Sequence, residues 1–173
     1  MDIFNEIIKE QDLKLKLIGR LIDHFYIKEE YEGFHWSGRK MIIDLLLKPR
    51  DLNNWANKNL YFGIEIKGTS INDTKDVMKY VRQCIDYSHT KWNRIGYMPV
   101  FLCPPIERVN LPITDESNRF MQHFLNQFNI GEVNYRKYIG LCLMMAGTHV
   151  IWSEINGVQE GNRNKLITKF GSQ

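Results

Sequence analysis

One aspartate interrupts an otherwise aliphatic run, Met41 to Leu47, which reads Met-Ile-Ile-Asp-Leu-Leu-Leu. A short apolar run closed by Lys48-Pro49 predicts a buried strand. A carboxylate inside a buried strand is costly to desolvate unless a cation or hydrogen-bond donors compensate it. Asp44 therefore requires a compensating group on a neighbouring element, and this requirement restricts how the chain can fold.

A second apolar run, Leu60 to Gly68, carries Glu65 and Lys67 two residues apart, and twenty residues separate Asp44 from Glu65. Alternate residues of a strand face the same side, so Glu65 and Lys67 share one face. If the two strands are neighbours, the two carboxylates can share a hard divalent cation. Such a cation lowers the pKa of a bound water, and an adjacent ammonium stabilises charge that develops on a phosphate. The pattern therefore favours phosphodiester hydrolysis.

The hydrophobic periodicity of the remaining chain predicts a mixture of helices and strands. We expect helices where apolar residues recur at helical spacing and strands where they form short runs. This order predicts an α/β protein with a mixed sheet and helices on both faces. The expected helices span 2–25, 74–90 and 115–128, and the expected strands span 29–38, 41–47, 60–68, 96–103, 138–145 and 149–155.

Length and composition indicate one soluble domain. A chain of 173 residues is the size of a single domain, and we expect a core over about 1–155 and a looser tail over 156–173. A net charge of +3 and a pI of about 8.7 favour a polyanionic partner. The three cysteines, each set among apolar residues, are expected to be reduced core residues. The start of the chain does not look like a signal peptide, and we expect a cytoplasmic protein that does not enter the membrane.

Asp44 followed by Glu65-Ile66-Lys67 resembles the signature of the PD-(D/E)xK nuclease superfamily. The resemblance covers roughly residues 1–103, with Ile43 in place of the usual proline. It implies a restriction-endonuclease-like fold, in which a mixed central sheet is flanked by helices. It also implies a deoxyribonuclease that leaves 5′-phosphate ends, with Mg²⁺ or Mn²⁺ bound by Asp44, Glu65 and the carbonyl of Ile66. Lys67 would position the attacking water.

Gln83 and Tyr87 lie four residues apart on the helix expected after the Glu65 strand, and therefore project together. This pair is similar to an extra motif of the RecB-like and lambda-exonuclease-like branch, where it contacts the nucleic acid. Alternatively, Tyr87 covers the edge of the core and Gln83 is solvated. Basic residues of the same helix would neutralise phosphates or simply form its solvated face; they are Lys75, Lys79 and Arg82.

Members of the superfamily commonly add to the metal site an acid from the first helix, which binds the metal directly or supports its ligands. Glu10, thirty-four residues before Asp44, fits this position best, and Glu6 is the rival. His24 is a further possible metal ligand, although a lone histidine is more often a hydrogen-bonded boundary residue.

Three alternatives stay open beside a DNA-cutting enzyme of this branch. The same scaffold serves type II restriction-like and junction-resolving endonucleases, and it also serves RNA-cutting enzymes, although DNA is the expected substrate. A nuclease-derived module that binds nucleic acid without turnover is the second alternative. The third is an ion-paired structural domain, for which divalent metal would not change stability. The protein would act alone, as a homo-oligomer or as a subunit of a larger DNA-processing complex.

Overall fold

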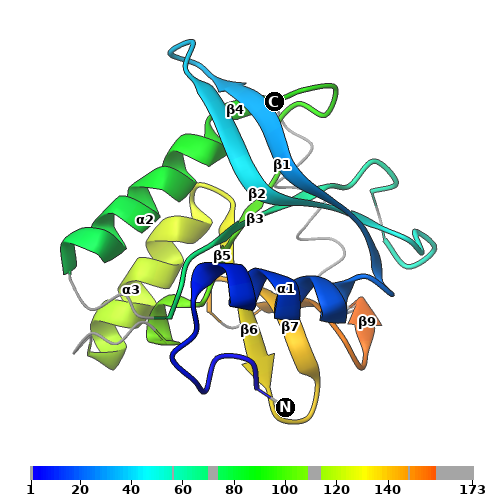
Figure 1. Ribbon diagram of the computed structural model, residues 1–173, viewed down its shortest axis with the longest axis vertical. Helices are drawn as coiled ribbons and strands as arrows, with labels where there is room; N and C mark the ends of the chain where they lie inside the picture. Colours follow the sequence, from blue (N-terminus) through cyan, green and yellow to red (C-terminus); the bar gives the residue numbers. More distant parts are fainter. Residues whose placement is uncertain (1, 56, 70–73, 109–113, 148, 159–173) are drawn as a thin grey trace.

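The protein has an α/β fold, and its described residues form a curled, mixed sheet of nine strands (Figure 1). The computed structural model describes residues 2–55, 57–69, 74–108, 114–147 and 149–158. The strand order is β4-β1-β2-β3-β5-β6-β7-β8-β9. The strands are β1 (Phe25–His35), β2 (Lys40–Pro49), β3 (Phe62–Ile66), β4 (Thr90–Trp92), β5 (Val100–Cys103), β6 (Ile130–Arg136), β7 (Gly140–Met145), β8 (His149–Ser153) and β9 (Gly157–Val158).

The centre of the sheet changes from antiparallel to parallel pairing. β2 pairs antiparallel with β1 and with β3, whereas β3, β5 and β6 are parallel neighbours. Helix α2 (Thr74–Ser88) lies in the connection between β3 and β5, as parallel neighbours require a long crossover. The C-terminal ends of β3, β5 and β6 therefore lie at the same edge of the sheet.

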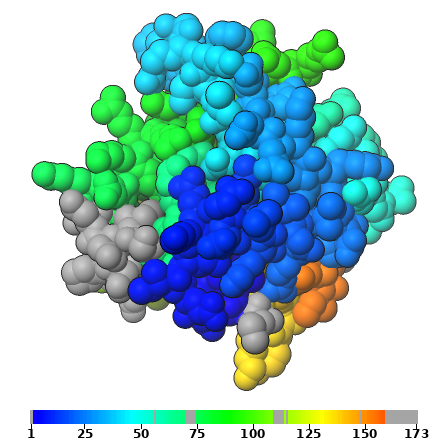
Figure 2. Space-filling model, in the orientation of Figure 1, coloured from blue at the N-terminus to red at the C-terminus, as the bar shows by residue number. Residues whose placement is uncertain are grey.

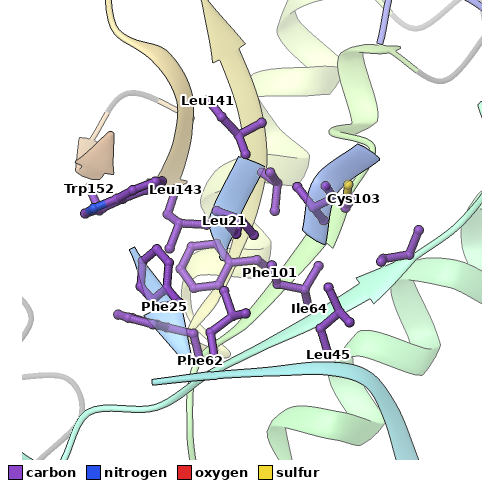
Figure 3. Close-up of a cluster of buried hydrophobic side chains, with 14 of the residues drawn as sticks. Leu21, Phe25, Leu45, Phe62, Ile64, Phe101, Cys103, Leu141, Leu143 and Trp152 are labelled. Atoms are coloured by element: carbon purple, nitrogen blue, oxygen red, sulfur yellow. The ribbon is translucent and has the colours of Figure 1, made fainter. Parts of the chain in front are cut away.

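Helices pack on both faces of the sheet, as the sequence predicts. Helix α1 (Glu10–Leu21) buries Leu13, Leu17 and Leu21, one per turn, in the first core. Figure 3 shows this core, in which Phe25, Phe62 and Phe101 meet side chains from β7 and β8. On the opposite face, α2 and helix α3 (Asp115–Asn126) cover the second core. These two helices lie side by side in Figure 1.

Several predicted boundaries are wrong, among them those of the strand expected over 29–38, which runs from Phe25 to His35 instead, and three strands were not predicted. The expected helix over 2–25 shrinks to α1, because Phe4 and Ile8 are buried without helical backbone and Phe25 opens β1. The expected strand over 96–103 shortens to β5. β4, β6 and β9 were not predicted, and β9 carries the sheet into the expected tail. Residues 159–173 lie outside the described part of the chain.

The segment before α1 docks directly beside the end of β3. The Ile8 N–H donates to Thr69 Oγ1 at 2.7 Å, and the Thr69 N–H donates to the Ile8 carbonyl at 3.0 Å. A Cβ on Gly68 would lie 3.1 Å from the Ile8 carbonyl oxygen, so glycine allows this close approach. The docking places the first residue of α1 next to Lys67. In Figure 2 the blue N-terminal residues cover the middle of the face, below the β1–β2 hairpin.

Cys84, Cys103 and Cys142 are free and buried, in agreement with their expected place in the core. None of the helices in the described ranges is long and apolar enough to cross a membrane.

Candidate functional site

Asp44 lies where the backbone pairing of β2 is interrupted. The β2–β3 register runs from Leu47↔Phe62 to Leu45↔Ile64. Beyond Leu45 the Asp44 side chain serves as the acceptor in place of a backbone carbonyl. Its Oδ2 accepts a hydrogen bond from the Ile66 N–H at 2.7 Å. On its other side Asp44 lies opposite Glu30, whose φ of 51° is rare for a residue other than glycine. Backbone strain of this kind is concentrated at functional sites.

Glu65 and Lys67 meet at the end of β3, as their spacing predicts. Lys67 Nζ lies 2.7 Å from Glu65 Oε1. The Glu65 side chain is almost completely buried, and its second oxygen, Oε2, has no hydrogen-bond partner among the described residues. A buried, unpaired carboxylate oxygen is unusual in a folded protein and requires an explanation. The Lys67 side chain retains an exposed fraction of 29% and so borders solvent.

Burial and the neighbouring Asp44 carboxylate raise the pKa of Glu65 to about 8, against the opposing effect of Lys67. Burial also acts to lower the pKa of Lys67, but the carboxylates of Glu65, Glu10 and Asp44 outweigh it and the pKa is raised. Lys67 is therefore a firmly held cation. Because the pKa of Glu65 is raised, a divalent cation that bound there would displace a proton from it.

Helix α2 turns two tyrosine hydroxyls toward this end of the sheet. Tyr87 donates to the Ile42 carbonyl at 2.6 Å, and Gln83 Nε2 donates to the Tyr87 hydroxyl at 2.7 Å. Tyr80 donates to the Glu65 carbonyl at 3.1 Å. The predicted pair of Gln83 and Tyr87 thus comes together two residues from Asp44. However, Tyr87 is buried, so only the partly exposed Gln83 is available to a ligand.

Helix α1 contributes one predicted acid and one lysine that was not predicted. Glu10 Oε2 lies 3.8 Å from Lys67 Nζ, whereas Glu6 pairs with Lys16 at 3.7 Å. Lys14, one turn after Glu10, is buried and pairs with Glu29 at 2.8 Å. Burial opposes its charge, but Glu29 and then Asp44 raise the pKa of Lys14. Its position between Leu13 and Leu17 on the buried face of α1 was the signal available in the sequence.

The remaining predicted residues are His24 and the basic residues of α2. The His24 ring packs against Trp152 with the ring centroids 5.1 Å apart, and both line a separate cavity of about 190 Å³ with Arg50 and Trp55. The basic residues of α2 lie on its exposed surface, and Lys79 there pairs with Asp76 at 2.9 Å; these residues are Lys75, Lys79 and Arg82.

Two carboxylates and one backbone carbonyl at this site are the groups that could ligate a metal ion. No group of three or more acidic, histidine or cysteine side chains in the described part of the chain could hold a metal. Asp44 and Glu65 nevertheless present two carboxylates, one of them with an oxygen that has no hydrogen-bond partner among the described residues, and the Ile66 carbonyl belongs to the same strand end. Mg²⁺ is usually bound by one or two carboxylates and keeps several waters.

Comparison of the chain with protein-family models, with curated proteins and with solved structures finds no match. The geometry of the site is therefore the basis for assigning a function.

Proposed function

We propose that the protein is a metal-dependent nuclease that hydrolyses DNA at Asp44, Glu65 and Lys67. One observation carries the proposal: these three side chains converge at one end of β3, where Glu65 Oε2 is buried without a partner among the described residues. Two neighbouring buried carboxyl groups destabilise the folded protein when both are ionised, and a bound divalent cation offsets that cost. The antiparallel β2–β3 pair, followed by α2 and the parallel strand β5, supports a restriction-endonuclease-like fold.

Each residue has a role that follows from its position. Asp44, Glu65 and the Ile66 carbonyl would hold Mg²⁺ or Mn²⁺, which supplies Lewis acidity and an activated water. Lys67, held as a cation by its carboxylate neighbours, orients the water and stabilises negative charge on the phosphate. Glu10 orients Lys67 from the other side. Gln83 contacts the DNA strand, and the buried Tyr87 fixes the Gln83 amide through their hydrogen bond.

A cleavage assay tests this function. Wild-type protein is expected to cut linear, circular or branched DNA with Mg²⁺ or Mn²⁺, to stop with chelator and to leave 5′-phosphate ends. Asp44→Ala and Lys67→Ala are expected to lower the rate at least about a hundredfold, because each removes a group that acts on the reacting phosphate. Digestion of linear but not circular DNA identifies an exonuclease.

A matched control is the exposed ion pair of Lys40 with Glu32, whose charged atoms lie 2.6 Å apart on the β1–β2 hairpin. Lys40→Ala and Glu32→Ala remove the same charges away from the site and are expected to keep activity. Mn²⁺ is expected to raise the melting temperature of wild type but not of Asp44→Ala. A wild-type protein that neither cuts DNA nor responds to metal refutes the proposal. Binding of DNA without cleavage indicates the non-catalytic module instead.

A further inference from the structure

Among the described residues, six aromatic or imidazole rings follow one another; His35 is buried, and the other five are at least partly exposed. The path runs from α3 past the end of α2 to the tip of the β1–β2 hairpin. Successive ring centroids lie 5.3 to 6.4 Å apart. We define this aromatic path by its members in order, Phe120, Phe124, Phe128, His89, His35 and Trp36.

Both ends of the aromatic path are open to solvent. Phe120 is 70% exposed and Trp36 is 78% exposed. Phe120 and Phe124 stack with an interplanar angle of 16°. Exposed aromatic side chains that touch one another mark an interaction site more often than single exposed ones do. The buried residues of α3, including Leu125, lie on its other side.

Hydrogen-bond donors run beside the rings of α3 in the same register. The sequence Arg119-Phe120, His123-Phe124, Gln127-Phe128 repeats a donor followed by an aromatic ring every four residues. Residues four apart on a helix lie above one another, so a stripe of donors accompanies the stripe of rings. All three donor residues are exposed. At the other end of the path, Arg39 is exposed and pairs with Asp86.

This combination of exposed rings and donors suits a single nucleic-acid strand. Single-stranded binding surfaces combine aromatic platforms for the bases with donors for the phosphates. In a duplex the base faces are already stacked, so they cannot cover these rings.

We propose that the aromatic path binds single-stranded nucleic acid, with bases stacked on Phe120, Phe124 and Trp36 and phosphates held by Arg119 and His123. The choice of nucleic acid as ligand rests on the proposed nuclease function. The surface is separate from the Asp44, Glu65 and Lys67 cluster, so binding there does not require catalysis.

Fluorescence anisotropy in chelator tests the surface without cleavage. The probes are a fluorescein-labelled oligothymidylate, an abasic strand of the same length and a duplex. Wild type is expected to bind the oligothymidylate about tenfold more tightly than the abasic strand, because only the former can stack. The double variant Phe120→Ala, Phe124→Ala is expected to lose about tenfold in affinity, and Trp36→Ala about fivefold.

The controls separate stacking from folding. Tyr138 is an 81% exposed aromatic residue outside the path, and Tyr138→Ala is expected to bind as wild type does. Phe120→Tyr with Phe124→Tyr keeps both rings and is expected to keep the affinity.

Two results overturn the inference: equal affinity for the abasic strand, or unchanged affinity in the phenylalanine double variant. If that double variant instead turns a wild-type dimer into a monomer without losing affinity, the surface joins two copies and the inference is again wrong. Normal single-strand binding by a protein that cuts nothing supports the surface and refutes only the nuclease proposal. If the protein cuts DNA but does not prefer the oligothymidylate to the abasic strand, the nuclease proposal is supported and the aromatic path is refuted as a binding surface.

Discussion

Glu65 shows how a single residue links stability to the candidate chemistry. Its side chain is 1% exposed and lies beside a second carboxylate, Asp44. A carboxyl group whose pKa is higher in the folded protein than in the unfolded chain holds a proton that unfolding releases. In the metal-free protein, Glu65 is therefore expected to lower the free energy of unfolding at pH values at which the folded protein has lost that proton.

The sign of this effect gives a prediction for Glu65→Gln. Stability contributed by protonated Glu65 is complete below the unfolded pKa of 4.5 and is lost as pH rises to about 8. Glutamine cannot ionise, so in chelator at alkaline pH the variant is expected to be more stable than wild type by a few kcal/mol, on the order of 3. Urea unfolding across this pH range measures the difference.

Glu132 is the matched control because it is also buried but lies outside the site. Burial raises its pKa to about 7, although the Ile106 N–H and Gln122 donate to it and oppose the shift. Glu132→Gln is expected to flatten the stability curve only between pH 4.5 and about 7, and to leave any response to metal intact. A Glu65→Gln variant with an unchanged curve contradicts the raised pKa of Glu65.

The sequence predicted the residues of the site whose spacing is periodic along one element. Glu65 and Lys67 alternate along a strand, and Gln83 and Tyr87 are one helical turn apart, so their proximity needed no tertiary information. Lys14 and Tyr80 were missed because their partners, Glu29 and the Glu65 carbonyl, lie on other elements. The hydrogen bond from the Tyr87 hydroxyl to the Ile42 carbonyl was not predicted for the same reason, because Ile42 lies on another element.

At the scale of elements, two glycines allow the central strands to pack. A Cβ on Gly131 of β6 would lie 2.3 Å from the Met144 carbonyl oxygen of β7. A Cβ on Gly63 of β3 would lie 2.4 Å from Ile43 Cδ1, which is the movable end of a side chain. The backbone of a strand cannot move aside as the end of a side chain can, so we expect Gly131 to tolerate an added Cβ less well than Gly63.

We therefore expect Gly131→Ala to cost about 3 kcal/mol and Gly63→Ala about 1 kcal/mol of unfolding free energy. Gly19, on the exposed side of α1, has open space where a Cβ would lie, with nothing within 4 Å. Gly19→Ala is the control and is expected to stabilise by up to about 1 kcal/mol through helix propensity. Denaturant unfolding of the three variants measures the order, and equal costs at Gly131 and Gly63 would contradict this packing.

Element prediction failed where polar residues are buried or apolar residues lie outside regular structure. β6 alternates apolar residues with Glu132 and Asn134, which are buried because Ile106, Gln122 and Glu107 hydrogen-bond to them. From the sequence alone such a strand looks solvated. Conversely, the helical spacing of Phe4 and Ile8 reflects docking on Thr69 rather than a helix.

At the scale of the whole molecule, one half-buried ion pair joins α1 to the far end of the sheet. Arg20 Nε donates to Glu154 Oε1 at 2.9 Å, and a second guanidinium nitrogen contacts the other carboxylate oxygen. Glu154 also accepts from the Leu141 N–H at 3.1 Å. Burial acts to raise the pKa of Glu154, but Arg20 outweighs it and the pKa is lowered.

Arg20→Met is expected to destabilise the protein by about 1 to 2 kcal/mol, because Glu154 loses a bidentate partner. The effect should fade as pH falls below 4.5, where Glu154 takes up a proton. A double-mutant cycle with Glu154→Gln isolates the pair. Lys16→Met, which removes the more exposed pair with Glu6, is the control and should cost about 0.5 kcal/mol or less. If the cycle gives no coupling energy between Arg20 and Glu154, this ion pair does not stabilise the fold.

The hydrogen bond from the Ile66 amide to Asp44 has a consequence for genetics. Because the same carboxylate completes the β2–β3 ladder and faces the proposed cation, damage at position 44 is expected to lower both protein abundance and turnover. The Lys67 side chain takes no part in that ladder, although it pairs with Glu65, so an allele changed there should lose turnover with a smaller loss of protein. Phenotypes at these two codons would therefore separate shortage of protein from lack of catalysis.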